Sequence, residues 1–284
     1  MDDAYPSELE QSKAMPMMRP VLFSMAMLLS MATQTAAQSN DAPSVASSCL
    51  AMASTMPRAF NVAYTPVSTM EGTVRIAYAG HSTYRIETPG GVTIATDYSG
   101  FYGSTPLPRI VTMNKAHRTH YTETPDPGIE HVLKGWGESG PARHGLAVDD
   151  VVIRNVTTDI RRWGASEPDA NSIFIFEVAG LCIGHLGHLH HELTNDHYAR
   201  IGRLDVVMVP VDGGLTSSLA NMETITRRLS SSVVLPMHRN STSIDAFTGR
   251  MGDAFDVRRL DGDTLDLSVR TLPERPTIFI PASL

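Results

Sequence analysis

The sequence predicts an α/β domain in which two β-sheets are covered by helices, and three observations support this. Short β-rich runs joined by tight turns follow one another from residue 73, and a second set begins at residue 151. After residue 193, helical segments alternate with buried strands, the pattern of β-α-β units. The chain has 284 residues, 42% of them hydrophobic and 19% charged, so it can bury a sizeable core.

The first half contains four predicted strands, at residues 74–78, 84–87, 92–96 and 109–113. The turn Pro89-Gly90-Gly91 joins the second strand to the third, which indicates a hairpin. The fourth strand runs into a polar loop that carries histidines.

The second half begins with a predicted strand at residues 151–154 and a hairpin that pairs residues 172–177 with 181–183 through Ala179-Gly180. A helix at 193–201, a buried strand at 206–210, a helix at 219–229 and a buried strand at 233–235 follow. Buried strands that alternate with helices are typical of a parallel sheet.

The N-terminus has the features of a secretory signal. Met17-Met18-Arg19-Pro20 is a short basic opening, residues 21–31 are apolar, and Thr35-Ala36-Ala37 offers a cleavage site after Ala37. The apolar run is shorter than the about 20 residues that span a bilayer, so a retained anchor is the weaker alternative. We therefore expect residues 1–37 to be an N-terminal extension and signal peptide, residues 38–70 a lead-in segment, and the mature protein to be periplasmic or secreted.

Cys49 and Cys182 are the only two cysteines of the chain. Export to an oxidising compartment would permit a disulfide between them. Alternatively, Cys182 is a small core residue of an apolar strand, and we favour this second interpretation.

The net charge of −7 disfavours nucleic acid as a partner, because phosphate binding requires a basic face. We expect a small-molecule substrate instead, and no membrane span after processing.

Potential metal ligands follow four of the predicted strands: His117 and His120, His185 and His188, Asp212, and His238. Groups at the carboxyl ends of strands in an open α/β sheet converge on one crevice. The spacing His-x-x-His occurs twice, and four histidines fall within residues 185–191. Neutral imidazole suits zinc, iron, nickel or copper but not magnesium or calcium. The isolated histidines His131, His144 and His197 are interpreted as surface or structural residues.

Motifs in a fixed order resemble the metallo-β-lactamase superfamily, nearest to the branch that includes L-ascorbate-6-phosphate lactonase. They span about residues 74–238 and comprise Gly80-His81-Ser82, Thr96-Asp97, the segment from Asn114 to His120, the segment from His185 to Thr194, Val209-Pro210-Val211-Asp212-Gly213-Gly214 and Pro236-Met237-His238. The resemblance implies that residues 71–284 form an αβ/βα four-layer sandwich. It also implies one or two zinc-like metals that activate water for attack on an ester, lactone, amide or phosphodiester.

The sequence departs from the family pattern at three ligand positions. In the family motif Thr-His-x-His-x-Asp-His, the first histidine corresponds to Lys115 of this chain and the aspartate corresponds to Thr119. A later aspartate, which bridges two metals in the family, corresponds to His188. An imidazole offers one lone pair and bridges metals poorly, so the resemblance implies one ion here, zinc foremost. The expected ligands are His117, His120, His188 and His238, with His185 or Asp212 as a further ligand or supporting group.

Two other aspartates are assigned through the resemblance. Asp97 matches a family aspartate that braces the ligand loop, although a turn-stabilising role is the alternative. The family's intermediate histidine has no clear match, and Asp159 could substitute for it.

These residues favour a metal-dependent hydrolase of a small ester, lactone or amide. Asp212 is the candidate base or water-positioning group, and Lys115 could polarise a carbonyl or phosphoryl oxygen. The alternative is a degenerate protein of the same fold that binds a metal or ligand without turnover. A redox or oxygen-handling metal protein ranks third, because no cofactor signature accompanies the histidines.

Overall fold

The computed structural model describes residues 47–50, 72–162 and 164–284. All of them belong to one compact unit of the chain. The predicted signal peptide and most of the lead-in segment lie outside the described residues. None of the helices in the described part of the chain is long and apolar enough to cross a membrane.

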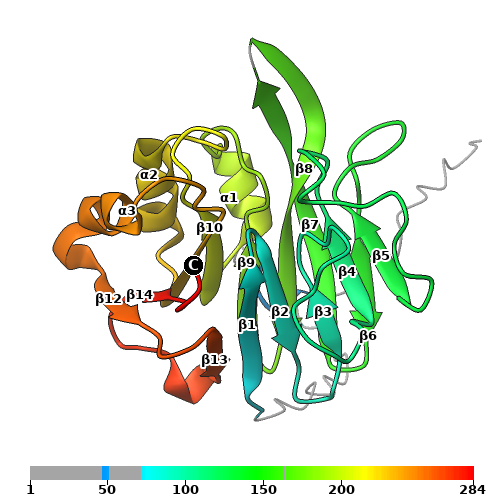
Figure 1. Ribbon diagram of the computed structural model, residues 1–284, viewed down its shortest axis with the longest axis horizontal. Helices are drawn as coiled ribbons and strands as arrows, with labels where there is room; N and C mark the ends of the chain where they lie inside the picture. The colour runs from blue at the N-terminus through cyan, green and yellow to red at the C-terminus, as the bar shows by residue number, and fades with distance from the viewer. Residues whose placement is uncertain (1–46, 51–71, 163) are drawn as a thin grey trace, which may run out of the picture. The chain divides into compact units, whose positions relative to one another are not determined.

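A six-stranded sheet has the order β13-β1-β2-β3-β4-β5 (Figure 1). Strands β1, β2 and β3 form an antiparallel meander, and β3, β4 and β5 are parallel. The bounds are β1 (Val74–Gly80), β2 (Thr83–Glu87), β3 (Thr93–Ala95), β4 (Ile110–Met113), β5 (His131–Lys134) and β13 (Thr264–Leu267).

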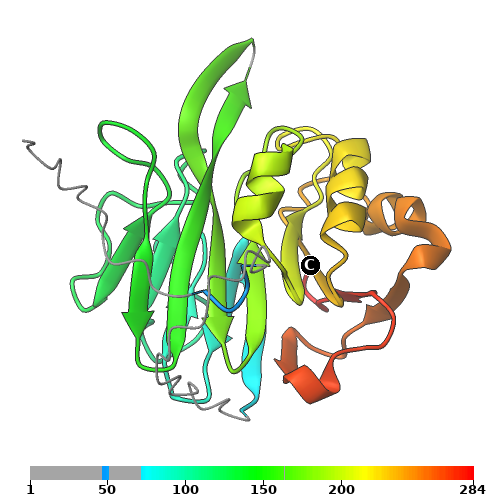
Figure 2. The ribbon, with the colours of Figure 1, turned by 180° about the vertical axis from the view of Figure 1, so that it is seen from behind.

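An eight-stranded sheet has the order β12-β14-β11-β10-β9-β8-β7-β6. Strands β6 to β9 are antiparallel neighbours, whereas β9, β10, β11, β14 and β12 run parallel. The β7–β8 hairpin extends past the rest of the sheet (Figures 1 and 2). The bounds are β6 (Gly145–Val148), β7 (Val151–Arg162), β8 (Ala165–Val178), β9 (Leu181–His185), β10 (Val206–Pro210), β11 (Val233–Met237), β12 (Asp256–Arg259) and β14 (Thr277–Ile280).

The three α-helices of the described residues all follow β9: α1 (Asn195–Ile201), α2 (Leu219–Leu229) and α3 (Ile244–Met251). A hydroxyl side chain caps each N-terminus, supplied by Thr194, Ser218 and Ser243. Short 3-10 turns occupy Gly252–Ala254 and Val269–Thr271. The predicted helix at 193–201 begins later, at Asn195, because Thr194 is its cap.

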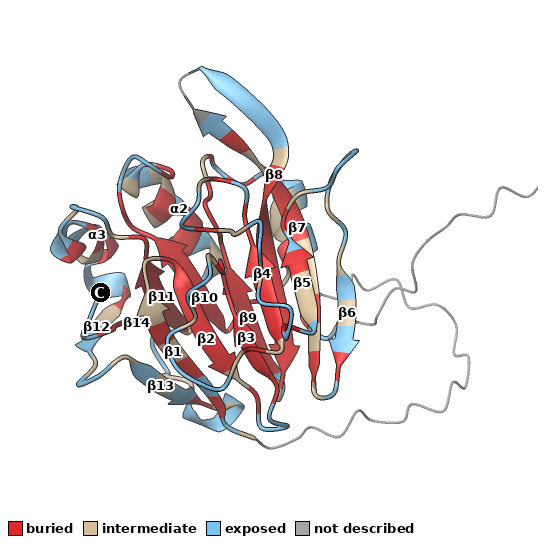
Figure 3. Ribbon diagram, turned by 45° about the vertical axis from the view of Figure 1, so that its right-hand side comes forward, coloured by how far each residue is buried: buried red, intermediate tan, exposed pale blue. Residues whose placement is uncertain are grey.

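The central strands of the eight-stranded sheet are buried (Figure 3), and their apolar residues belong to two separate core clusters. Side chains alternate along β8, so Phe174 and Phe176 join the cluster that contains Ile76 and Ile86 of the other sheet. Ile173 and Ile175 point the other way, into the cluster that contains residues of α2 and α3. The α/β architecture with two packed sheets is therefore confirmed.

The sequence analysis missed β5, β6 and every element after β11. It also favoured an unpaired Cys182, and this is corrected, because Cys49 and Cys182 form a disulfide in the structure. The bond joins residues 133 positions apart and attaches the segment 47–50 to β9.

The same segment is held by the carboxylate of Glu177, on β8. The carboxylate accepts hydrogen bonds from the Ser47 hydroxyl (2.5 Å) and the Ser48 backbone N–H (2.8 Å). The Arg154 Nε–H donates to it as well (2.8 Å). Burial alone would raise the pKa of Glu177, but these donors outweigh burial and lower it.

We expect Glu177→Gln to destabilise the protein at pH 7 by about 1–3 kcal/mol, because the amide cannot replace a carboxylate that accepts from Arg154 and two serines. The folded-state pKa of Glu177 is lowered, so its contribution is present above the ordinary glutamate pKa and is lost as the pH falls through the folded value. In urea unfolding experiments between pH 7 and pH 3, the free energies of unfolding of the variant and the wild type should become closer as the pH falls. Glu130→Gln, at an exposed ion pair with Arg109, is the control with little expected effect.

Candidate metal centre

Polar residues that lie at the carboxyl ends of strands from both sheets meet at one edge of the structure. His81 follows β1, Asp97 follows β3, and the loop with His117 and His120 follows β4. From the other sheet, His188 follows β9, Asp212 follows β10 and His238 follows β11. Ligands far apart in sequence thus come together as the strand-end pattern predicts.

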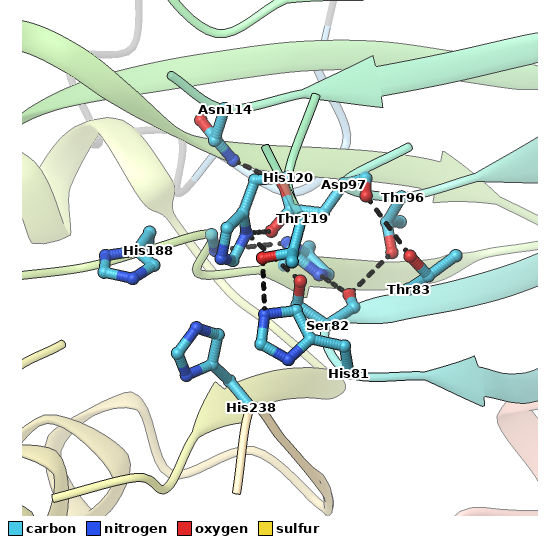
Figure 4. Close-up of polar contacts among 12 residues, drawn as sticks. His81, Ser82, Thr83, Thr96, Asp97, Asn114, Thr119, His120, His188 and His238 are labelled. Carbon is cyan, nitrogen blue, oxygen red and sulfur yellow. Dashed lines mark hydrogen bonds and ion pairs between the residues drawn. The ribbon is translucent and has the colours of Figure 1, made fainter. Parts of the chain in front are cut away.

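Five imidazoles surround one space. Ligand nitrogens of His81, His117, His120 and His238 lie within 4.8 Å of one another. The fifth, His188, places Nε2 3.1 Å from Nε2 of His117, and its ring centroid lies 4.7 Å from that of His120. The rings of His81, His120, His188 and His238 face this space from three sides (Figure 4).

A buried carboxylate orients His120. The Nδ1–H of His120 donates to Oδ2 of Asp97 (2.7 Å), and Asn114 Nδ2 donates to Oδ1 of the same aspartate (2.8 Å). Burial would raise the pKa of Asp97, but nearby His185 and His120 and these hydrogen bonds lower it to about 2. Asp97 is therefore ionised, and the contact is the one expected of a residue that braces the ligand loop.

Asp212 orients His238 in the same way. The Nδ1–H of His238 donates to Oδ2 of Asp212 (3.0 Å). The backbone N–H groups of Gly214 and Thr216 (both 2.9 Å) and of Leu215 (2.5 Å) donate to Oδ1. Burial opposes ionisation, but the bonds from His238 and Thr216 outweigh it and hold the pKa of Asp212 well below its usual range.

The two carboxylates leave Nε2 of His120 and Nε2 of His238 buried and without a hydrogen-bond partner among the described residues. A buried polar atom without a partner costs about 1–3 kcal/mol, so this pair of nitrogens is suited to binding a metal ion. Two nitrogens about 2.0–2.1 Å from one tetrahedral zinc lie about 3.3 Å apart, close to the 3.1 Å between His117 and His188. The donor set fits a late first-row metal such as zinc.

Burial and the neighbouring imidazoles keep two of these histidines neutral. Both lower the pKa of His81, to about 4, and both lower the pKa of His188 strongly. The His188 backbone N–H donates to Oδ1 of Asn171 (2.7 Å), and its Nδ1 lies 2.7 Å from Nε2 of His190. Neutral imidazoles can offer lone pairs to a metal.

Three residues at the site have a left-handed backbone conformation that favours glycine: His81 (φ 51°), Asp97 (φ 44°) and His238 (φ 52°). Each such residue costs about 1–2 kcal/mol. Strain of this kind gathers at functional sites, where surrounding contacts hold it in place. Here it turns strand-end side chains toward the common space.

The structure corrects the expectation that His185 is a ligand. Nε2–H of His185 donates to the Ser82 carbonyl oxygen (2.8 Å), and Nδ1 accepts from the Gly187 backbone N–H (3.1 Å). Both nitrogens are therefore occupied by backbone, and His185 serves as a buried support.

The two residues predicted to be catalytic, Asp212 and Lys115, make other contacts in the structure. Asp212 is saturated with donors and has a lowered pKa, so it is a poor base and a good orienting group for His238. Lys115 forms an ion pair with Glu167 on the β7–β8 hairpin. Asp159 accepts from the Asp169 N–H (3.2 Å) and offers no ligand to the cluster.

The sequence analysis assigned no role to His81, although it lies within the quoted motif Gly80-His81-Ser82. In the structure its ring centroid lies 4.2 Å from that of His238 and 5.1 Å from that of His120. The signal was a histidine directly after the first strand, at the same strand end as the candidate ligands.

Comparison with protein-family models matches residues 75–238 to the Beta-lactamase superfamily domain. No curated protein matches the chain.

Three solved structures are similar in fold. A protein from Thermotoga maritima, named as a Zn-dependent hydrolase of the metallo-β-lactamase superfamily, is 24% identical with a TM-score of 0.55, covering 73% of this chain and 98% of its own. A protein from Parabacteroides distasonis, named as a metal-dependent hydrolase, is 14% identical with a TM-score of 0.51, covering 64% and 90%. A metallo hydrolase from Ignicoccus hospitalis is 17% identical with a TM-score of 0.50, covering 69% and 99%.

Proposed function

The chain belongs to the beta-lactamase superfamily, and on this premise we propose that it is a metal-dependent hydrolase of a small ester, lactone or amide. The observation that carries the proposal is the pair of buried Nε2 atoms on His120 and His238, which have no hydrogen-bond partner in the described part of the chain. On each ring, a carboxylate holds Nδ1. Similar folds named as metal-dependent hydrolases support it. Among these substrate classes, the sequence resemblance to the branch that includes L-ascorbate-6-phosphate lactonase supports a lactone.

His117, His120, His188 and His238 would hold the metal, which we propose to be a single zinc ion. When bound, a zinc ion supplies a Lewis acid that makes water nucleophilic near pH 7. Among the described residues, His81, His117, His120 and His238 form a convergent donor group without a carboxylate, and Nε2 of His188 lies 3.1 Å from Nε2 of His117. Asp97 and Asp212 each fix a ring through Nδ1, so that Nε2 keeps its lone pair.

The test is elemental analysis of protein purified without added metal, followed by turnover assays on a lactone, a β-lactam and a phosphodiester. We expect about one zinc per chain and hydrolysis of the lactone. Protein that takes up no metal and turns over none of these substrates would defeat the proposal.

The second candidate function is a non-catalytic metal-binding protein. It is favoured by Lys115, which forms an ion pair with Glu167 at the position where the family motif has a ligand histidine. The variant with Lys115→His, Thr119→Asp and His188→Asp distinguishes the two. Activity gained from an inert parent would support the non-catalytic candidate, whereas activity lost from an active parent would support the enzyme.

We further propose that the protein is exported and acts on a small molecule. The Cys49–Cys182 disulfide supports export, because disulfides persist in oxidising compartments. The net charge of −7 supports a small-molecule substrate over nucleic acid. Mass spectrometry of the secreted protein should find a new N-terminus at Gln38.

A further inference from the structure

The Thr119 hydroxyl lies between two imidazoles of the site. Its Oγ1 is 2.9 Å from Nε2 of His81 (Figure 4) and 2.7 Å from Nδ1 of His117. We propose that Thr119 keeps His81 out of the metal's ligand set and holds it as an N–H donor to the substrate. This inference rests on the proposed function.

The proton positions on these side chains follow from the role of His117. If His117 offers its Nε2 lone pair to a metal, the proton of the neutral ring must be on Nδ1. That Nδ1–H donates to Oγ1 of Thr119. The threonine hydroxyl then donates its single hydrogen to Nε2 of His81. A neutral His81 that accepts at Nε2 carries its own proton on Nδ1, and Nδ1 has no lone pair for a metal.

The number of ligands supports the same assignment. His117, His120, His188 and His238 already provide four imidazoles. Catalytic zinc sites keep a position open for water or substrate and sometimes expand to about five ligands in the transition state, a number that four imidazoles and one water already reach. A fifth imidazole from His81 would fill the position that the water requires.

The identity of residue 119 decides the direction of the bond to His81. A hydroxyl can accept from one imidazole and donate to another, whereas a carboxylate only accepts. An aspartate at position 119 would accept a hydrogen bond from Nε2–H of His81, and Nδ1 of His81 would then carry the lone pair. Thr119 is therefore a positioning residue whose hydroxyl turns His81 from a possible ligand into a donor.

The proposed role of His81 in the reaction is to donate a hydrogen bond to the carbonyl oxygen of the substrate. The centroid of the His81 ring is 4.2 Å from that of His238 and 6.0 Å from that of His117, so His81 borders the imidazole cluster. In the proposed arrangement, the carbonyl of a substrate lies beside it. An N–H donor there would stabilise the negative charge that develops on the carbonyl oxygen during attack. Loss of one such donor lowers kcat by about 100-fold to 1,000-fold.

The test uses zinc- and cobalt-loaded full-length protein. Nitrogen-15 NMR of the zinc form should find the His81 proton on Nδ1 in wild type and Thr119→Ser, and on Nε2 in Thr119→Asp. The His81→Ala variant should keep its cobalt stoichiometry and its visible absorption spectrum, with affinity changed by less than about threefold. His120→Ala, which removes a ligand, should lose cobalt and supplies the matched comparison.

Two outcomes would overturn the inference while the proposed function survives: a His81 proton on Nε2 in the zinc form, or a changed cobalt spectrum in His81→Ala. A wild-type protein that binds neither zinc nor cobalt would overturn both proposals. The two failures are therefore distinguishable.

Discussion

Replacing Asp212 with asparagine will weaken zinc binding by about 10-fold to 100-fold, the usual cost of losing a group that orients a metal ligand. Three backbone N–H groups donate to Oδ1 of Asp212, so the amide oxygen of the variant must take that side. The NH₂ group then donates a hydrogen bond to Nδ1 of His238, so the proton of the neutral imidazole must be on Nε2. That nitrogen can no longer bind a metal.

Competition between the protein and a chromophoric chelator will measure the change in zinc affinity. Asp97→Asn should behave similarly, because Asp97 holds Nδ1 of His120. Asp150→Asn is the matched control: its carboxylate accepts from Thr88 and Gly90, away from the histidines, and zinc affinity should not change. Unchanged zinc affinity in Asp212→Asn with lower turnover would instead favour the base role first predicted for Asp212.

The sequence predicted the strands that carry the site better than the strands that complete the sheets. Residues 206–210 and 233–235 are long apolar runs, so their burial is encoded locally. Strands β5 and β6 have four residues each and form only because β4 and β7 offer them an edge. Short segments of this kind are decided by pairing rather than by their own sequence.

The strands after His238 were also not predicted, because they too depend on pairing with distant strands. Strand β14 inserts in parallel between β11 and β12, whereas β13 crosses to pair with β1 of the other sheet. Such long-range pairings leave little pattern in a four-residue strand.

The histidines illustrate what sequence spacing can and cannot decide. His185 and His188 are three residues apart, yet His185 is the last residue of β9, paired with Phe174 and Met208, and faces the Ser82 carbonyl. His188 lies beyond the strand, where the chain turns at Gly187 and presents the imidazole to the cluster. The spacing identified the region, and backbone geometry selected the residue.

The second large effect is expected at Gly187, where φ is +62°. A Cβ there would lie 2.4 Å from Oδ1 of Asn171 and 2.5 Å from Nδ2 of Asn114. Oδ1 of Asn171 accepts the hydrogen bond from the His188 backbone N–H, and Nδ2 of Asn114 donates to Asp97. A Cβ at residue 187 would displace both atoms and break both hydrogen bonds. With about 1–2 kcal/mol for the left-handed backbone and about 1–3 kcal/mol for each of the two buried polar contacts, Gly187→Ala should lower the free energy of unfolding by about 3–8 kcal/mol.

Urea unfolding will measure this loss, and zinc affinity should fall with it because His188 and Asp97 both lose their supports. Gly214→Ala is the control, since a Cβ at Gly214 meets nothing within 4 Å and its φ is not positive. Its free energy of unfolding should stay within about 0.5 kcal/mol of wild type. If Gly187→Ala unfolds at the same urea concentration as Gly214→Ala, the two asparagines do not hold the site, and His188 must owe its position to the imidazoles around it.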